Sequence, residues 1–401
     1  AEAFGTKLLI VDPGARAPPG SAAVPLDDTW RQGAANAAPH QPARSARALP
    51  FRILMTSGTT GVPKGVEMTH ARAVAWCQLV SAALNLTSPQ RHLSVLPLAF
   101  TGSFILNLPH LLLGNTVELF PPLFTPEEFV AAVKTRGITS STIVPTLLRR
   151  LLAMPRDHSP LLPELDYLVC LGSSLSADER RDAVRLLTRN FFDNYGASGC
   201  GPITFLSAAD IESHADSVGR AVAQTQVQVV DGQGRPRAAG EIGLLRCRGP
   251  AVAEGFCNAT SDGGGELFDN GWYHPGELAS IDQDGFIYLA GRASDLILRG
   301  AINVYPVEIE QVLMRHPGVR EAAVVGAPSL EYDEDVVAFV QVVPGVLERD
   351  LMETCRRYLS SYKVPSLIVV LDELPKNPAG KILKPELLQR LAQRQYPKAR
   401  N

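Results

Sequence analysis

The sequence predicts an α/β protein with a large N-terminal domain and a small α+β C-terminal domain. The chain has 401 residues, which is more than one ordinary hydrophobic core accommodates. Short apolar strands alternate with helical segments between about residues 93 and 189, as in mostly parallel sheets with helices. After residue 217 the pattern changes to period-two alternation interrupted by glycine turns, which predicts a small antiparallel, β-barrel-like subdomain.

The first seventy residues contain little regular pattern. Residues 6–12 (TKLLIVD) and 51–55 (FRILM) are apolar enough for buried strands, whereas 13–50 are rich in Pro, Ala, Gly and Arg and are predicted to be mostly loop. A helix is predicted from about Thr69, a plausible N-cap, to Leu84.

The next segments alternate between strand and helix. Strands are predicted at LSVLPL, TVELF, ITSSTIV and YLVCLG, with helices near 126–135, 146–154 and 176–189. Residues 93–113 lack Asp, Glu, Lys and Arg but include Pro97 and Pro109, so a buried strand–turn–helix is favoured over a membrane span.

The β-rich subdomain is predicted at about 215–292, followed by a helix at 307–315 and a strand at 321–325. We therefore expect one domain over 1–292 and a second over 293–401.

Composition excludes several classes of function. The net charge of −3 gives no electrostatic argument for binding nucleic acid or an anionic membrane. The six cysteines form no C-x-x-C pair and none lies at zinc-ligand spacing from a histidine. Reduced thiols are typical of the cytoplasm, and the N-terminus shows no signal-peptide pattern, so we expect a cytoplasmic protein without a membrane span.

The sharpest local signal is the segment 56–65, TSGTTGVPKG. Its three glycines let backbone N–H groups approach an anion, its hydroxyls add donors and Lys64 adds a positive charge. A strand before it and a helix after it would suit phosphate binding. The spacing of Gly61 and Lys64 does not fit a Walker A loop. The alternative is an ordinary Gly/Thr turn.

This segment resembles the signature loop of the adenylate-forming superfamily, and four later segments strengthen the resemblance. They are 193–202 (DNYGASGCGP), 276–279 (GELA), 291–306 (GRASDLILRGAINVYP) and 375–382 (PKNPAGKI), which resemble the adenine-side loop, the ribose motif, the hinge with its following loop, and the C-terminal lysine motif. Five motifs in the family's order, between residues 53 and 384, make chance resemblance untenable.

The resemblance implies a mobile C-terminal domain, a hinge at Ser294 and catalytic roles for Lys381 and Lys64. A cation near a carboxylate that attacks a phosphate reduces charge repulsion. The residues that the resemblance assigns to ATP or AMP are Thr56, Ser57, Gly58, Thr59, Thr60, Gly61, Lys64, Gly172, Ser173, Asp193, Asn194, Tyr195, Gly196, Ser198, Glu277, Ile287 and Arg292. The residues expected to line the acid pocket are Phe100, Thr101, Gly172 and Gly196.

Three departures from the family pattern affect these expectations. Gly199 stands where relatives usually have a glutamate ligand of Mg²⁺, so metal binding should be weaker, and no metal ligand is assigned. The usual Gly-Gly-Glu-Asn of the hinge-following loop is Gly-Ala-Ile-Asn at 300–303. Relatives also carry a whole subdomain before the phosphate loop, where this chain has little more than fifty residues.

The resemblance implies ATP-dependent activation of a carboxylic acid to an acyl-adenylate, with Mg²⁺ as cofactor, then transfer to coenzyme A. Thr101 replaces the aspartate that holds an α-ammonium group in amino-acid-activating relatives, so an aryl or medium-length aliphatic acid is expected. The alternatives left open are loading of a carrier-protein phosphopantetheine arm and a catalytically impaired nucleotide- or acyl-binding relic. Whether the chain forms a homo-oligomer also stays open.

Overall fold

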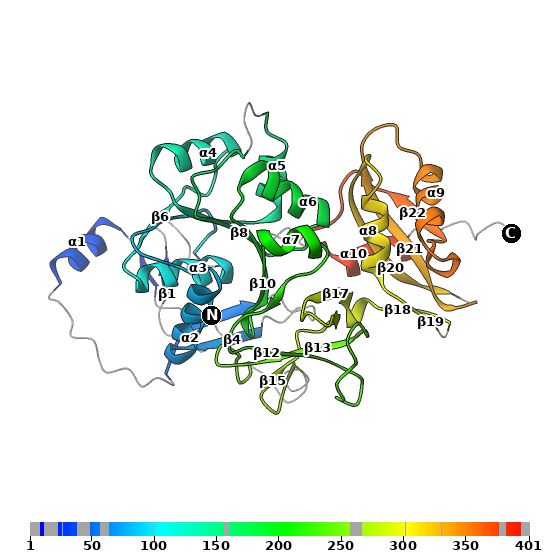
Figure 1. The fold of residues 1–401 in the computed structure, drawn as a ribbon, viewed down its shortest axis with the longest axis horizontal. Coiled ribbons are helices and arrows are strands. Elements are labelled where there is room, and N and C mark those ends of the chain that lie inside the picture. The colour runs from blue at the N-terminus through cyan, green and yellow to red at the C-terminus, as the bar shows by residue number, and fades with distance from the viewer. Residues whose placement is uncertain are drawn as a thin grey trace.

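The computed structural model describes residues 9–11, 23–25, 27–37, 49–56, 64–98, 100–155, 160–256, 267–300, 302–329, 331–376 and 382–393. A large body contains a central sheet and a second, antiparallel sheet, and the C-terminal residues form a separate unit with their own sheet (Figure 1). The predicted fold class, α/β with a smaller α+β unit at the C-terminus, is confirmed.

The central sheet has seven strands in the order β11-β10-β9-β8-β7-β5-β6. The strands from β6 to β9 are parallel to their neighbours, whereas β10 and β11 are antiparallel. The bounds are β5 (Arg91–Ser94), β6 (Thr116–Leu119), β7 (Ser140–Ile143), β8 (Tyr167–Leu171), β9 (Phe191–Ala197), β10 (Gly201–Ser207) and β11 (Arg220–Ala221).

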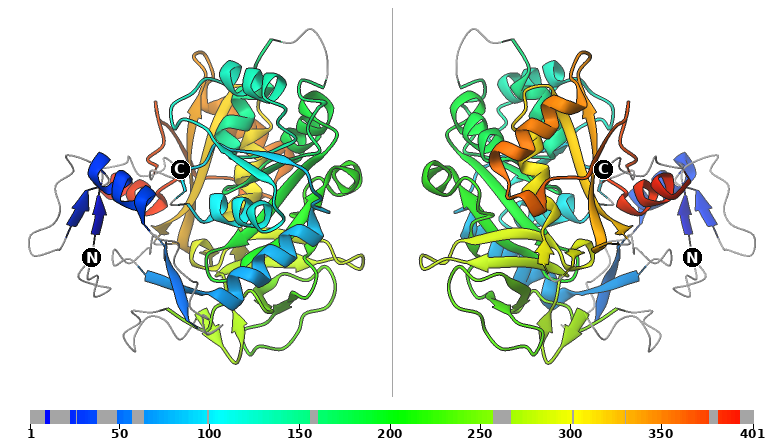
Figure 2. Two further views of the ribbon diagram at one scale, coloured as in Figure 1. Left: turned by 90° about the vertical axis from the view of Figure 1, so that its left-hand side faces the viewer. Right: turned by 90° about the vertical axis from the view of Figure 1, so that its right-hand side faces the viewer.

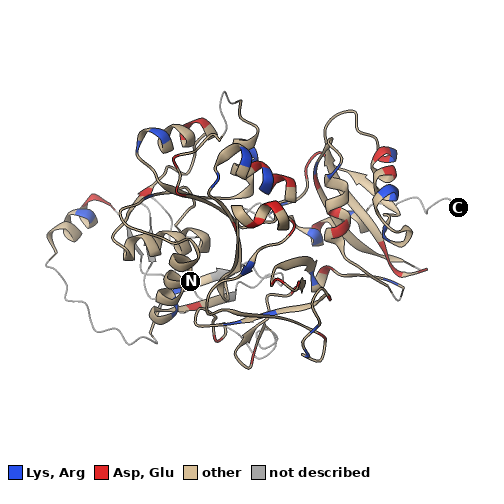
Figure 3. Cartoon of the chain, viewed as in Figure 1, with Lys and Arg blue, Asp and Glu red and all other residues tan. Residues whose placement is uncertain are grey.

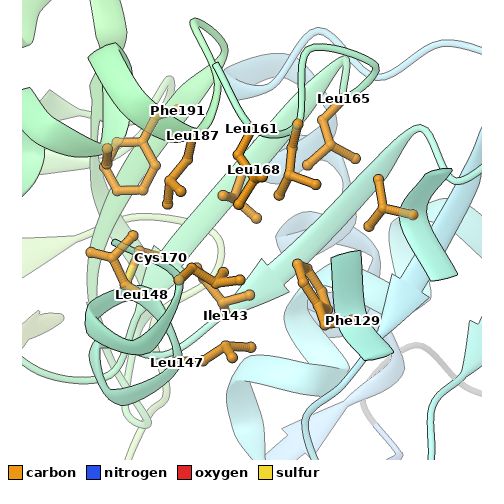
Figure 4. Packing of buried hydrophobic residues seen from close by; sticks show 14 of the residues in the cluster. Phe129, Ile143, Leu147, Leu148, Leu161, Leu165, Leu168, Cys170, Leu187 and Phe191 are labelled. Carbon is orange, nitrogen blue, oxygen red and sulfur yellow. The ribbon is translucent and has the colours of Figure 1, made fainter. Parts of the chain in front are cut away.

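Helices cover both faces of this sheet. Successive side chains of a strand point to opposite faces, so the buried strands present apolar side chains to the helices on each side. In β8, Leu168 and Cys170 pack on one face with α4 (Pro126–Thr135), α5 (Pro145–Leu152), α6 (Ala177–Asp182), the π-helical η2 (Ala183–Leu187) and α7 (Ala208–His214), as Figure 4 shows in part. Tyr167, Val169 and Leu171 pack on the other face with α2 (His70–Ala83) and α3 (Thr101–Leu112).

The helix starts follow from capping chemistry. Thr69, the predicted N-cap, accepts a hydrogen bond from the backbone N–H of Arg72. Thr125 with Glu128, and Ser176 with Glu179, form reciprocal capping boxes at α4 and α6. Residues 93–113 form the predicted strand, turn and helix, and no helix among the described residues is long and apolar enough to cross a membrane.

The N-terminal region differs from the prediction at two places. The segment 13–50, predicted as mostly loop, includes β2 (Ala23–Pro25), which pairs with β1 (Leu9–Val11), and α1 (Asp28–Asn36). Asp27 caps α1, because its side chain accepts a hydrogen bond from the backbone N–H of Trp30. Such a capping bond does not appear in the apolar periodicity of the sequence. Helix α1 is exposed and lies at the periphery in all views (Figures 1 and 2).

The second sheet is antiparallel throughout, as predicted. Its order is β14-β15-β13-β16-β17, with β12 also on β13, and these pairings among the described residues form an open sheet and not a closed barrel. The bounds are β12 (Gln226–Val230), β13 (Gly243–Arg248), β14 (Phe268–Asp269), β15 (Trp272–Tyr273), β16 (Glu277–Ile281) and β17 (Ile287–Arg292).

The C-terminal unit has the sheet order β19-β18-β21-β20, with β22 parallel to β21. Its helices enclose two apolar clusters, one on each face of this sheet. The bounds are η4 (Ala293–Asp295), β18 (Ile297–Arg299), β19 (Ile302–Val304), α8 (Pro306–Met314), β20 (Val319–Ser329), β21 (Asp333–Val342), α9 (Glu348–Tyr358), η5 (Ser361–Lys363), β22 (Leu367–Val370) and α10 (Lys384–Gln393).

Candidate nucleotide and acid site

The carboxyl ends of the parallel strands bring several predicted residues together, as is usual for ligand sites in such sheets. Gly172 and Ser173 follow β8 and are exposed. The register pairs Leu171 with Asn194, so Gly172 lies beside the Asn194–Tyr195 segment of β9. Gly172 has φ +107°, a conformation that favours glycine and permits the sharp exit from the strand.

The predicted acid-pocket residues Phe100 and Thr101 lie at the N-terminus of α3. The next residue, Gly102, packs so closely that a Cβ atom there would be 2.6 Å from Cδ1 of Leu171. This contact places the start of α3 next to Gly172. The Phe100 side chain is 44% exposed, so it is accessible beside the strand ends.

Tyr195, Glu277 and Arg292 meet across two sheets. The Tyr195 hydroxyl donates to Oε2 of Glu277 at 3.2 Å, and an Nη2 atom of Arg292 lies 3.8 Å from Oε1. Burial and the nearby Glu277 carboxylate raise the pKa of Tyr195, so the phenol stays protonated and a donor. The aromatic ring is therefore held in a fixed orientation by a carboxylate that can accept several hydrogen bonds.

Two other predicted residues of the adenine-side loop have their side chains engaged within the protein. Nε of Arg180 donates to Oδ2 of Asp193 at 2.7 Å, and both side chains are buried. Burial raises the pKa of Asp193, and Arg180 opposes that shift. Nδ2 of Asn194 donates to the carbonyl of Thr204 at 2.8 Å. These bonds connect β9 to α6 and β10, so we assign Asp193 and Asn194 to shaping the loop.

The adenine-side loop has no room for a side chain at two glycines. A Cβ on Gly196 would be 2.4 Å from the carbonyl oxygen of Gly201. A Cβ on Gly199 would be 2.5 Å from the ring of Tyr273, which is buried in β15. Ser198, between them, is half-buried.

The described residues do not fit a magnesium ion held by a carboxylate at this loop, because the Tyr273 ring occupies the space beside Gly199. They also contain no group of three or more His, Cys, Asp and Glu side chains arranged to hold a metal.

Charged side chains of both signs are interspersed over the ribbon (Figure 3).

The phosphate loop joins two antiparallel strands. Thr56 ends β3 (Pro50–Thr56) and pairs with Lys64, which begins β4 (Lys64–Thr69). The predicted helix from about Thr69 is present as α2, but β4 lies between the loop and this helix, so the helix N-terminus is not at the loop. Residues 57–63, and so Ser57, Gly58, Thr59, Thr60 and Gly61, lie outside the described residues, and only the backbone of Thr56 and Lys64 is described.

Lys381 also lies outside the described residues, but both ends of its segment are placed. Lys376 and Ile382 form an antiparallel bridge, and Leu383 N–H donates to the carbonyl of Pro375 at 2.8 Å. Lys384 then contacts Asp295 at 3.5 Å and Glu310 at 2.8 Å. Lys384, which follows this segment, thus lies close to η4, which contains Ser294.

The predicted hinge is hydrogen-bonded to the segment predicted to bind the ribose. Ala293 N–H donates to the carbonyl of Gly276 at 2.9 Å, and the Ser294 hydroxyl donates to Oδ1 of its neighbour Asp295 at 3.0 Å. Ile287, which was expected at the nucleotide, is fully buried in the core of the second sheet, and its backbone bonds to Val218 and Gly219.

Sequence reasoning missed Arg180 and Tyr273. Arg180 lies in the helix predicted near 176–189, and nothing in its spacing indicates a buried ion pair. Tyr273 is far from Gly199 in the sequence. The pairing of β15 with β13 at Cys247 brings the two residues close together in space. Asp295 and Lys384 likewise meet only through tertiary packing.

Comparison with known proteins agrees with this geometry. The family model of AMP-binding enzymes matches residues 6–257, and that of the AMP-binding enzyme C-terminal domain matches 308–381. The chain is 35% identical over 338 residues to a long-chain-fatty-acid–CoA ligase of Escherichia coli O157:H7, covering 83% of this chain and 60% of that protein. It is 34% identical to a feruloyl-CoA synthase of Amycolatopsis sp., covering 84% and 69%.

Solved structures give the same result. The o-succinylbenzoate CoA synthetase of Bacillus subtilis in complex with its acyl-adenylate intermediate has a TM-score of 0.86 and 26% identity, covering 96% of this chain and 79% of that chain. The same enzyme with ATP and magnesium gives 0.84, with coverage of 96% and 80%. The fold and the comparisons together place the chain in the class of the AMP-binding enzymes.

The chain belongs to the AMP-binding enzyme family. It spans 60% of the length of the Escherichia coli ligase that it matches.

Proposed function

We propose that the protein uses ATP to activate a carboxylic acid as an acyl-adenylate, releases pyrophosphate, and transfers the acyl group to coenzyme A. The observation that carries this proposal is the convergence of Gly172, Thr101 and the Tyr195–Glu277 pair at the strand ends. Curated relatives named as long-chain-fatty-acid–CoA ligase and feruloyl-CoA synthase support an aliphatic or aryl acid.

In this proposal the residues of the site have distinct roles. The Tyr195 ring forms a flat wall for the adenine, and Glu277 accepts hydrogen bonds from the ribose hydroxyls. The amides and hydroxyls of 56–61, with Lys64, bind the phosphates, while Lys381 neutralises the carboxylate and the α-phosphate as they approach. Magnesium is carried on the ATP phosphates and water, as is common for this ion, and no step depends on a protein carboxylate at residue 199.

We also propose the division of labour between the two domains. Residues 1–292 bind the nucleotide and the acid, and residues 293–401 rotate about Ser294 between the adenylation and thioester steps. The contact of Lys384 with Asp295, next to Ser294, supports this division, because it anchors the C-terminal unit at the proposed hinge.

The test is acid-dependent exchange of pyrophosphate into ATP with a panel of aryl and C6–C12 aliphatic acids. We expect exchange with at least one acid, followed by thioester formation when coenzyme A is added. Competition between coenzyme A and a phosphopantetheinylated carrier protein identifies the acceptor. Preferential loading of the carrier protein would replace the coenzyme A proposal.

One observation favours a second candidate, a nucleotide- or acyl-binding protein with impaired catalysis. The Tyr273 ring fills the space beside Gly199, where a carboxylate would otherwise assist the metal. Binding of ATP measured by calorimetry, together with no exchange for any acid of the panel, would support this candidate against the first.

A further inference from the structure

Two arginines of the second sheet share one tryptophan ring. Arg246 and Arg248 lie in β13, and their guanidinium carbon atoms are 4.4 Å and 4.5 Å from the centre of the Trp272 indole ring in β15. Both distances are short enough for cation–π attraction. Trp272 is only 8% exposed, as expected when long arginine side chains lie over an aromatic ring.

The face of the sheet that carries these residues points away from the candidate nucleotide and acid site. Tyr273 packs against Gly199 of the adenine-side loop, and its register partner Cys247 belongs to the same apolar cluster. Successive side chains of a strand point to opposite faces, so the two arginines and Trp272 lie on the outer face of the sheet. Strands β12, β13 and β15 lie together at the lower edge of the large body in Figure 1.

Two glutamines of β12 orient the guanidinium groups. Nε and Nη2 of Arg246 donate to Oε1 of Gln228 at 3.1 Å and 2.7 Å. Nε of Arg248 donates to Oε1 of Gln226 at 2.7 Å. Each glutamine is the register partner of its arginine. A glutamine is neutral, so it fixes the guanidinium without cancelling its charge, and a group that is already fixed loses less entropy when it binds a ligand.

The positive charge of this outer face is not compensated by the protein. Glutamine oxygens accept the hydrogen bonds of Arg246 and Arg248, and no carboxylate forms an ion pair with either arginine among the described residues. Asp269, the register partner of Trp272, instead accepts a hydrogen bond from Asn270 at 2.7 Å. Two like charges held around one ring repel each other, and a bound anion would relieve this repulsion.

We infer that this outer face binds a phosphate monoester between Arg246 and Arg248. The planar guanidinium matches phosphate oxygens with paired N–H donors, and two such groups against one ring can reach the same small anion. A phosphate monoester carries roughly −1.5 to −2 charges at pH 7, so a single group balances both arginines. The covered Trp272 ring offers no surface on which a base could stack, which disfavours single-stranded nucleic acid. The inference is independent of the proposed function.

The experiment titrates the intact protein with glycerol 3-phosphate at constant ionic strength, and binding is measured by calorimetry and by tryptophan fluorescence. We expect saturable binding of glycerol 3-phosphate and none of glycerol or acetate. Arg246→Gln and Arg248→Gln should each weaken binding by about tenfold or more, because a charge-assisted contact is lost. The matched control is Arg235→Gln, which removes the same charge from an arginine paired with Asp231 at 2.8 Å and should keep the affinity.

A further variant separates a defined site from general attraction to positive charge. Gln226→Ala keeps both arginines and the net charge but releases the Arg248 guanidinium, so it should weaken binding by about threefold or more. Tm of each free variant is measured first. Arg246→Lys and Arg248→Lys retain the charge and the aliphatic cover of Trp272, and they should also bind more weakly because lysine lacks the planar fork.

Three results would overturn the inference. They are no saturable binding to the wild-type protein, unchanged affinity in both Arg→Gln variants, and the same affinity in Gln226→Ala as in the wild type. The second result would place the anion at another site, such as the segment 56–65. None of these results bears on the proposed function, which is tested by pyrophosphate exchange.

Discussion

Two glycines of the predicted adenine-side loop, Gly196 and Gly199, are constrained by packing. Gly199 is the sharpest case, because a Cβ there would overlap the buried Tyr273 ring. We expect Gly199→Ala to lower the free energy of unfolding by about 1–3 kcal/mol, the usual cost of overpacking a core. Urea denaturation measures this change.

The control is Gly232→Ala, since nothing lies within 4 Å of a Cβ at that turn. It should change stability by no more than about 0.5 kcal/mol, as is usual at the surface. If Gly199→Ala behaved like Gly232→Ala, the Tyr273 ring would not be fixed as described, and a glutamate introduced at 199 could then fit.

Lys381 was identified from its motif, and its role stays a prediction. Lys381→Ala should reduce pyrophosphate exchange by about a hundredfold or more, because a positive charge on the reacting anions is lost. Thioester formation from supplied acyl-adenylate should change far less. The two rates are measured separately by exchange and by single-turnover thiolysis.

Lys376→Ala is the matched variant, because Lys376 lies at the base of the same segment and pairs with Glu321. It should retain exchange. An equal loss in both steps for Lys381→Ala would contradict a role specific to adenylation.

At the scale of elements, the packing of α3 on the sheet makes stability depend on pH. Burial lowers the pKa of His110 to about 4, and burial together with the neighbouring His110 lowers that of His92. The unfolded chain binds protons near the ordinary histidine pKa, but the folded protein does not. The contribution of the two neutral histidines to the free energy of unfolding is therefore fully present above about pH 6.5 and is lost as the pH decreases towards 4.

We expect His110→Gln to reduce the difference in unfolding free energy between about pH 7.5 and about pH 5 by roughly 1–2 kcal/mol. Glutamine can still bond to Tyr167 but does not titrate. Urea titrations at both pH values give the difference. If the difference in unfolding free energy between the two pH values were the same in the wild-type protein and in His110→Gln, other groups would cause the loss of stability in acid.

Elements with a strong local sequence pattern were predictable, whereas elements that form by pairing with another strand were not. The parallel strands and α4 follow from apolar runs and the Thr125 cap. Strand β4 was missed because its alternation is confined to Val66–Thr69, too short a run to identify a strand next to a glycine-rich loop, and its partner β3 lies on the other side of that loop. The same reasoning explains the site: Tyr195 and Glu277 could be named from motifs, whereas their mutual bond, and the contact of Tyr273 with Gly199, depend on sheet pairing.

At the scale of the whole molecule, the proposed rotation requires η4 to change its backbone conformation. Gly291, with φ +116°, and Ala293, bonded to Gly276, fix the chain on the side of the second sheet. Lys384 and Glu310 fix the other side through Asp295 and α8. Ser294 lies between these anchors, so it is the residue whose φ and ψ angles can change most.

Ser294→Pro should therefore separate the two half-reactions. Proline fixes φ near −65°, which suits the first turn of a helix such as η4 but prevents a large rotation at that bond. We expect pyrophosphate exchange to stay within about twofold of wild type, while thioester formation falls by about tenfold or more, because the proposed rotation of the C-terminal unit between the two steps is blocked. Ser294→Ala, which removes only the hydroxyl bonded to Asp295, should leave both rates unchanged. Equal thioester rates in the proline and alanine variants would place the rotation elsewhere in the chain.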